Sequence, residues 1–104
     1  MAATAESKVK RRVSDILKKA SDVYYFMPVQ TGYGSPTLDY LGSSKGRAFA
    51  METKAPGKVP TTRQKVIMHE MKKAGMKVFV IDGKPRDYEK LRLWLFFNDG
   101  VHKT

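Results

Sequence analysis

Residues 49–57 read Phe-Ala-Met-Glu-Thr-Lys-Ala-Pro-Gly, and this stretch gives the clearest indication of both fold and function. Side chains of a β-strand alternate between two faces, so Glu52 and Lys54 share one face while Met51 and Thr53 lie on the other. A strand seldom carries two charges on a packed face unless those charges are paired or used. The Pro-Gly pair ends the strand, which predicts an acid and a base at a strand tip, where a loop begins.

The composition limits the class of protein and its partners. The chain has 104 residues, a length typical of one small domain, so we expect a single domain over residues 1–104. Twenty Lys and Arg against ten Asp and Glu give a net charge of +10, which favours a polyanionic partner such as nucleic acid or an anionic membrane. No apolar run approaches the ~20 residues of a spanning helix, and no signal-peptide pattern is present, so we expect a cytoplasmic protein without a membrane role. Cysteine is absent, so a metal would be held by oxygens or by the two histidines, and oxygen ligands suit Mg²⁺ or Mn²⁺.

The first segment, residues 4–20, predicts a helix because apolar residues recur at helical spacing and basic residues occupy the opposite face. Glu6 lies three residues before Val9, so it continues the apolar stripe rather than the basic face. Two interpretations remain open for Glu6. It is either a solvated glutamate near the positive end of the helix dipole, or an acid that reaches into a site.

Two short strands are predicted before the central one, over residues 23–27 and 38–41, with residues 42–46 as the turn into the central strand. Asp39 stands among apolar residues of the second strand and would share a face with Leu41. Adjacent antiparallel strands bring opposed side chains within about 5 Å of each other. Asp39 is therefore expected near Glu52, one hairpin away.

The segment after Pro-Gly predicts a helix that begins after Thr61 or Thr62 and ends near Gly75. Gln64 heads the inner stripe of this helix, so it points inward either as a satisfied core amide or as a site residue. The other members of that stripe are expected to be Ile67, Met68, Met71 and Ala74.

The C-terminal third predicts a strand and a last helix. Residues 77–81 are nearly all apolar, as in a strand covered on both faces, and a helix is expected over about 87–97. That helix has more apolar surface than one core face needs, which indicates either a subunit interface or a wider core contact, and we expect a homodimer. The residues concerned are Leu93, Trp94, Phe96 and Phe97. The order of elements predicts an α/β fold in which helices flank a small mixed β-sheet.

Asp39, Glu52 and Lys54 together suggest metal-dependent chemistry. Two neighbouring carboxylates repel each other unless a cation lies between them, and Mg²⁺ or Mn²⁺ with a nearby carbonyl and waters would relieve that repulsion. Such an ion lowers the pKa of a bound water and stabilises charge on a phosphate oxygen. Lys54 would then orient the water or neutralise charge on the phosphate, which amounts to phosphodiester hydrolysis.

These motifs, in this order, resemble the VRR-NUC (virus-type replication and repair nuclease) group of the PD-(D/E)XK nuclease superfamily. The resemblance covers residues 31–82 and rests on Thr31-Gly32-Tyr33-Gly34, Leu38-Asp39-Tyr40, Gly46-Arg47, residues 50–57, Pro60-Thr61, Gln64, Ala74-Gly75 and residues 78–82. One difference is that Pro36 lies three residues before Asp39, whereas the family often has proline directly before the aspartate.

The resemblance implies a restriction-endonuclease-like core and a role for each site residue. Asp39 and Glu52 would be metal ligands, the Thr53 carbonyl would complete the protein coordination, and Lys54 would be the catalytic lysine. Gln64 matches the helix glutamine of the family. Glu6 falls where some members carry an N-terminal helix acid.

The expected activity is therefore that of a Mg²⁺- or Mn²⁺-dependent DNA endonuclease. Stand-alone members of this size resemble phage-encoded enzymes, some of which act as dimers on branched DNA such as Holliday junctions or flaps, and a phage enzyme would work in the host cytoplasm. A non-catalytic basic DNA-binding module that keeps the nuclease fold is the alternative. The residues expected to contact DNA are Lys8, Arg11, Arg12, Lys58, Arg63 and Lys65.

Overall fold

A computed structural model describes residues 4–29 and 36–97, and it confirms the α/β class. The elements in chain order are α1 (Ala5–Lys19), β1 (Val23–Phe26), β2 (Tyr40–Ser44), β3 (Arg47–Thr53), α2 (Thr62–Lys73), β4 (Lys77–Ile81), α3 (Pro85–Arg92) and η1 (Leu93–Phe97), a π-helical continuation of α3. The motif at residues 31–34 and the tail from Asn98 lie outside the described residues. No helix within the described ranges has both the length and the apolar character needed to cross a bilayer.

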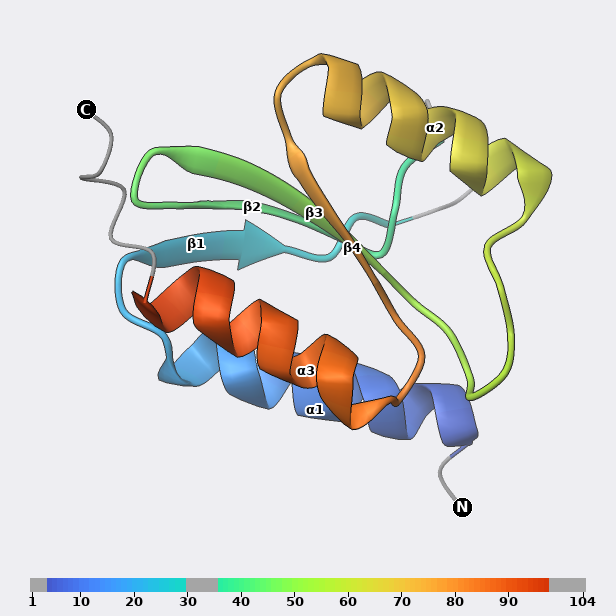
Figure 1. The fold of residues 1–104 in the computed structure, drawn as a ribbon, viewed down its shortest axis with the longest axis horizontal. Coiled ribbons are helices and arrows are strands. Elements are labelled where there is room, and N and C mark those ends of the chain that lie inside the picture. Colours follow the sequence, from blue (N-terminus) through green and yellow to red (C-terminus); the bar gives the residue numbers. More distant parts are fainter. Residues whose placement is uncertain (1–3, 30–35, 98–104) are drawn as a thin grey trace.

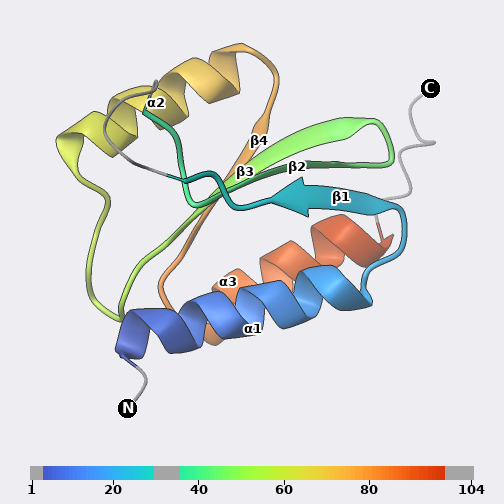
Figure 2. The same cartoon turned by 180° about the vertical axis from the view of Figure 1, so that it is seen from behind.

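The four strands form one mixed sheet in the order β1-β2-β3-β4. β1 with β2 and β2 with β3 are antiparallel, whereas β4 runs parallel to β3 after the crossover through α2. Helices α1 and α3 cover one face of the sheet and α2 covers the other (Figures 1 and 2). β3 therefore lies inside the sheet and between two layers of helices, which is the position expected for the central strand.

The alternation predicted for β3 is confirmed by its packing. Phe49 and Met51 belong to the larger core, which is built with α1 and α3. Ala50 belongs to a smaller core on the opposite face, where it packs with Leu38 and with Met68 of α2. Glu52 is therefore on the face covered by α2, together with Ala50.

The hairpin between β2 and β3 is tighter than the sequence suggested. Residues 42–46 were expected to form the turn, but β2 continues to Ser44 and only Lys45 and Gly46 connect the strands. Both connecting residues have positive φ (52° and 82°), as in the two-residue turns that match strand twist. Gly42 lies in the strand because a side chain there would collide with the Tyr24 carbonyl oxygen and come within 2.7 Å of the Phe49 ring.

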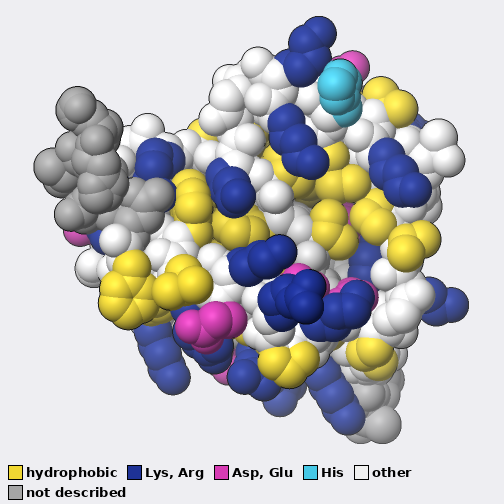
Figure 3. Space-filling model, viewed as in Figure 1, with side chains coloured by type: hydrophobic (Ala, Val, Ile, Leu, Met, Phe, Trp, Pro, Cys, Tyr) yellow, Lys and Arg dark blue, Asp and Glu magenta, His cyan; other side chains and the backbone are white. Residues whose placement is uncertain are grey.

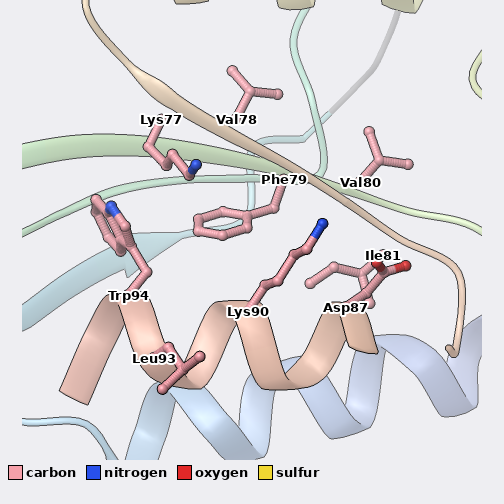
Figure 4. A pocket seen from close by; sticks show the side chains of 9 residues that line it. All are labelled: Lys77, Val78, Phe79, Val80, Ile81, Asp87, Lys90, Leu93 and Trp94. Carbon is pink, nitrogen blue, oxygen red and sulfur yellow. The ribbon is translucent and has the colours of Figure 1, made fainter. Parts of the chain in front are cut away.

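The expectation that residues 77–81 are covered on both faces is met only in part, because Phe79 and Ile81 are buried in the larger core and Val78 packs against the smaller one, whereas Val80 is exposed. β4 is an edge strand, and Val80 remains 36% exposed. α2 covers the start of the strand, where Val78 packs against the smaller core, and Ala74 at the end of α2 is exposed rather than part of an inner stripe. A pocket of about 480 Å³ opens between β4 and α3, and Lys90 extends from the helix toward the strand in it (Figure 4).

The last helix joins the core through Tyr88, Leu91 and Leu95, which are buried. Trp94, which was expected to contribute to an interface, instead packs edge-on against Phe49 and Phe79, with ring centroids 5.7 Å apart in both pairs. Three other apolar side chains of this helix remain exposed, and they are Leu93 (47%), Phe96 (41%) and Phe97 (74%).

The tip of the β2–β3 hairpin holds the end of the last helix. Arg47 Nη2 donates to the Trp94 carbonyl (3.1 Å), and the guanidinium lies 3.9 Å from the centre of the Trp94 ring. Lys45 Nζ donates to the Leu95 carbonyl (3.3 Å). Cations near the C-terminal carbonyls of a helix satisfy those acceptors and interact favourably with the helix dipole.

Candidate active site

The candidate active site is formed by side chains from four chain segments, which hydrogen bonds connect: the first turns of α1, the approach to β2, the end of β3 and the start of α2. Asp39 precedes β2, and the register Tyr40↔Met51 places it opposite Glu52 when continued by one residue. Its Oδ2 accepts hydrogen bonds from Thr53 N (2.9 Å) and Thr53 Oγ1 (2.8 Å). The buried Thr53 thus fixes Asp39 at the tip of β3. The sequence predicted that Asp39 lies near Glu52, but it did not predict the hydrogen bonds with Thr53.

Gln64 is oriented by the start of its own helix. Thr61 caps α2 by accepting from Gln64 N (3.1 Å), and Gln64 Oε1 accepts in return from Thr61 N (2.9 Å), which is a capping box. Because the amide oxygen is committed to the cap, the Nε2 group faces inward and donates to Glu52 Oε2 (2.8 Å). The structure therefore brings Gln64 to Glu52, and it explains why an amide is suited to this position.

Glu52 is a deeply buried carboxylate of the site. It is 3% exposed, and its Oε2 also lies 3.5 Å from Lys54 Nζ. Burial and, second, the charge of Asp39 raise the pKa of Glu52, while Lys54 acts in the opposite direction. The other oxygen, Oε1, is buried and has no protein hydrogen-bond partner. When such a carboxylate is ionised, its buried oxygen needs a cation or a hydrogen-bond donor to offset the cost of burial.

Lys10 is the site residue that the sequence analysis missed. Its Nζ lies 2.9 Å from Glu6 Oε2 and 3.4 Å from Asp39 Oδ2, so it connects the two acids. Burial, the largest single influence, lowers the pKa of Lys10, but the hydrogen bond to Glu6 and the charges of Asp39 and Glu6 together outweigh it, so the pKa is raised. Glu6 therefore reaches the site through Lys10. The signal was available, because Lys10 follows Glu6 by one helical turn and must share its face.

Tyr40 fixes α1 relative to the sheet next to this ion pair. Its hydroxyl is 2.8 Å from Ser14 Oγ and donates to the Lys10 carbonyl (3.0 Å). The ring itself is fully buried in the larger core. Because Tyr40 directly follows Asp39 in sequence, one buried side chain sets the position of Lys10 with respect to Asp39.

The donor set is compatible with a divalent cation of the Mg²⁺ or Mn²⁺ type. Within residues 4–29 and 36–97, no three Asp, Glu or His side chains are grouped closely enough to hold one ion. Two carboxylates with a backbone carbonyl is a sparse set, but Mg²⁺ commonly binds through one or two carboxylates and keeps several waters. The buried, unpartnered Glu52 Oε1 beside a second acid is the feature that fits a cation here.

The six residues expected to contact DNA are all exposed, but they form two groups. Lys8, Arg11 and Arg12 lie on α1, on the flank away from Lys10, and Lys58, Arg63 and Lys65 lie at the start of α2 or just before it. Lys and Arg side chains are spread over the face seen in Figure 3, with apolar patches between them. In the second group, Arg63 and Lys65 flank Gln64 in sequence, at the end of α2 that contributes Gln64 to the candidate active site.

Comparisons of the chain with protein-family models, with curated proteins and with solved structures found no match.

Stability of the metal-free protein is expected to depend on pH through Glu52. The pKa in the folded state lies above the ordinary value of 4.5, so the folded protein binds this proton more tightly than the unfolded chain. The resulting stability is fully present below pH 4.5 and is lost as the pH rises through the folded-state pKa. Urea unfolding in EDTA at several pH values should show this loss in the wild type and not in Glu52→Gln. Equal pH dependence in the two proteins would contradict the assignment.

Lys10→Met should strengthen binding of Mn²⁺, because an ammonium ion beside Asp39 competes with a divalent cation for the same negative potential. The change is expected to be modest, up to about fivefold, since partly exposed ion pairs are worth ~1 kcal/mol or less. Without metal, the same variant should unfold at a lower temperature because Asp39 and Glu6 lose a common cation. Calorimetric titration and melting in EDTA measure the two effects, with Lys18→Met on the same helix as the control. Weaker Mn²⁺ binding in Lys10→Met would contradict competition.

Proposed function

We propose that this protein is a metal-dependent endonuclease that hydrolyses phosphodiester bonds in DNA. One observation carries the proposal: a buried carboxylate oxygen of Glu52 has no protein partner, and a second acid and a lysine lie beside the same group. Such a cluster is costly to maintain in a small domain unless it is used. The resemblance to VRR-NUC nucleases assigns the same residues to phosphodiester hydrolysis.

Each residue has a role that follows from its place in the site. Asp39, Glu52 and the Thr53 carbonyl would hold the ion, with Thr53 N and Oγ1 orienting Asp39 and Gln64 orienting Glu52. When bound, a Mg²⁺ or Mn²⁺ ion supplies charge stabilisation at the phosphate and a water of lowered pKa. Lys54, one strand position beyond Thr53 and half-buried, is placed to position that water or to neutralise negative charge on the phosphate.

DNA is the expected substrate because the chain carries a net charge of +10 and exposes basic side chains beside the site. The preference for branched DNA, such as a four-way junction or a flap, comes from the family resemblance. In that setting the enzyme would act in the cytoplasm of its host cell.

A non-catalytic DNA-binding module is the second candidate, and one observation favours it. Each carboxylate already has a lysine nearby, Lys10 at 3.4 Å from Asp39 and Lys54 at 3.5 Å from Glu52. Lysines that neutralise the two carboxylates in this way allow the site to exist without a metal ion. The two candidates differ in one respect only, namely whether the protein cuts DNA.

A cleavage assay decides between them. Purified protein is incubated with supercoiled plasmid, a four-way junction and a flap, each with Mg²⁺, with Mn²⁺ and with EDTA. The proposed function predicts cleavage of at least one substrate with a divalent ion and none in EDTA. Binding of all three DNAs without cleavage under any condition would instead establish the binding module.

A homodimer joined partly through the last helix remains a prediction. Trp94 packs against the larger core of its own chain. The exposed apolar side chains of the last helix that remain available to a partner subunit are therefore Leu93, Phe96 and Phe97. Sedimentation at micromolar concentration should give about twice the 11.8 kDa of the chain. A single species of 11.8 kDa, unchanged by adding junction DNA beyond one protein per junction, would contradict the dimer.

A further inference from the structure

A second concave surface, which we call the outer groove, lies between α1 and the last helix, away from the sheet. Its volume is about 600 Å³. The residues that line it are Lys8, Arg11, Arg12, Asp15, Ile16, Lys19, Arg92 and Phe96. None of these residues takes part in the hydrogen bonds or ion pairs described above for the candidate active site, so the groove is a separate feature of the molecule.

The charge of the outer groove is strongly one-sided, because five cationic side chains line it against the single carboxylate of Asp15. The Arg12 guanidinium lies 4.6 Å from the centre of the Tyr88 ring, which holds this charge in place. Arg92 is only loosely neutralised, since Glu89 Oε1 is 3.6 Å from Nη1 and both side chains are partly exposed. Charge complementarity therefore requires an anionic occupant with several charges in a row.

The apolar residues of the groove decide which polyanion fits best. Ile16 is buried beneath it, and Phe96 presents a ring that is 41% exposed. The phosphate backbone of a duplex uses cations but offers no apolar surface to such a ring. An unpaired strand offers both, because its phosphates meet the cations and its bases stack on aromatic side chains.

We propose that the outer groove binds an unpaired nucleic-acid strand, with its phosphates on the α1 cations and a base against Phe96. Lys8 and Lys19 mark the ends of the groove on α1, about 16 Å apart at 1.5 Å per residue. Lys8 is two residues from Glu6, so this end of the groove lies at the same end of α1 as the candidate active site but on a different flank of the helix. A groove of this kind implies that the nuclease prefers DNA with a single-stranded arm, and this preference rests on the proposed function. Binding of the strand itself does not rest on it.

Fluorescence anisotropy in EDTA tests the proposal without any cleavage. The probes are a labelled oligothymidylate of about twelve nucleotides, within the site sizes of single-strand binders, and a labelled duplex of equal length. The charge variant Arg11→Gln/Lys19→Gln is matched by Lys72→Gln/Lys73→Gln at the end of α2, which removes the same charge from exposed positions on the opposite face. The ring variant Phe96→Ala is matched by Phe26→Ala on β1, whose ring is 49% exposed, does not line the groove and lies outside the surface predicted for the dimer.

Phe96→Ala should bind the oligothymidylate about 5- to 150-fold more weakly, the range of base–aromatic stacking of ~1–3 kcal/mol. The affinity of Phe96→Ala for the duplex, and the affinities of Phe26→Ala for both probes, should stay close to those of the wild type. Losing two phosphate contacts, at about 0.7 each for single strands, should reduce the log–log salt slope of Arg11→Gln/Lys19→Gln by about 1.4. If melting shows that Phe96→Ala does not fold, Phe96→Leu removes the ring while keeping apolar packing.

Three results would overturn the proposal. Equal losses of oligothymidylate affinity in Phe96→Ala and Phe26→Ala would exclude the Phe96 ring from the site. Equal losses of affinity for the duplex and for the single strand in Phe96→Ala would indicate a surface that binds the duplex backbone. Competition by an oligoglutamate peptide that equals oligothymidylate at matched charge would indicate an acidic peptide instead. Failure of the proposed function has a different signature, because strand binding in EDTA would persist while no DNA is cut with Mg²⁺ or Mn²⁺.

Discussion

Glu52→Gln abolishes DNA cleavage while leaving the fold and DNA binding intact, if Glu52 holds the ion. The substitution keeps the shape of the side chain and an oxygen that can accept from Gln64, but it removes the charge that the ion requires. A loss of at least ~10³-fold is expected, in line with removing an essential electrostatic element from a catalytic site. In EDTA near neutral pH, the variant should melt at the same temperature as the wild type or higher, because the buried charge is unfavourable without metal.

The matched control for this experiment is Glu70→Gln, which removes the same charge from an exposed position of α2. The Glu70→Gln variant should cut DNA at the wild-type rate, and both variants should bind DNA equally in EDTA. Cleavage by Glu52→Gln near the wild-type rate with Mg²⁺ would eliminate Glu52 as a ligand. Loss of cleavage together with loss of DNA binding would point to a misfolded variant rather than to the ion.

Lys54→Met slows the chemical step by about 10²- to 10³-fold but spares binding of the divalent ion. Methionine keeps most of the apolar stem of this half-buried side chain, so the change is mainly the loss of the ammonium group. That group lies 3.5 Å from Glu52 Oε2, and its loss should raise the pKa of Glu52 further. Activity should therefore need a higher pH in the variant than in the wild type.

Single-turnover rates with saturating Mn²⁺ and calorimetric Mn²⁺ titration separate the two effects for Lys54→Met. Lys72→Met at the exposed end of α2 is the control for general loss of positive charge. Normal single-turnover rates together with abolished Mn²⁺ binding would assign Lys54 a structural role. A slow step that excess Mn²⁺ fully restores would also remove Lys54 from the chemistry.

The parts of the fold that follow from local pattern could be predicted from the sequence. The two faces of β3 and the cap of α2 depend on side-chain periodicity and on capping residues, which neighbours in sequence specify. The same local information predicted that Gln64 points inward and that Asp39 lies opposite Glu52.

Errors arose where the answer depends on tertiary neighbours. β4 has the composition of a buried strand, yet no further strand follows it within the described residues, and α2 covers only part of one face. Gly42 resembles a turn residue, but it is needed inside β2 because Tyr24 and Phe49 leave no space for a side chain. The pairing of Lys10 with Glu6 follows from helical spacing, but its second partner, Asp39, is 29 residues away in sequence and reaches it only once α1 packs on the sheet.

The contact between the β2–β3 hairpin and the last helix has a consequence for synthesis on the ribosome. Arg47 is made 47 residues before Trp94, whose carbonyl and ring it contacts. At ~5–20 residues per second, the hairpin waits about 2–10 s for that partner. During this interval Phe49 has no Trp94 ring against it, so the face of the sheet that forms the larger core is incompletely covered. The nascent chain therefore keeps part of its core face exposed until the last helix emerges.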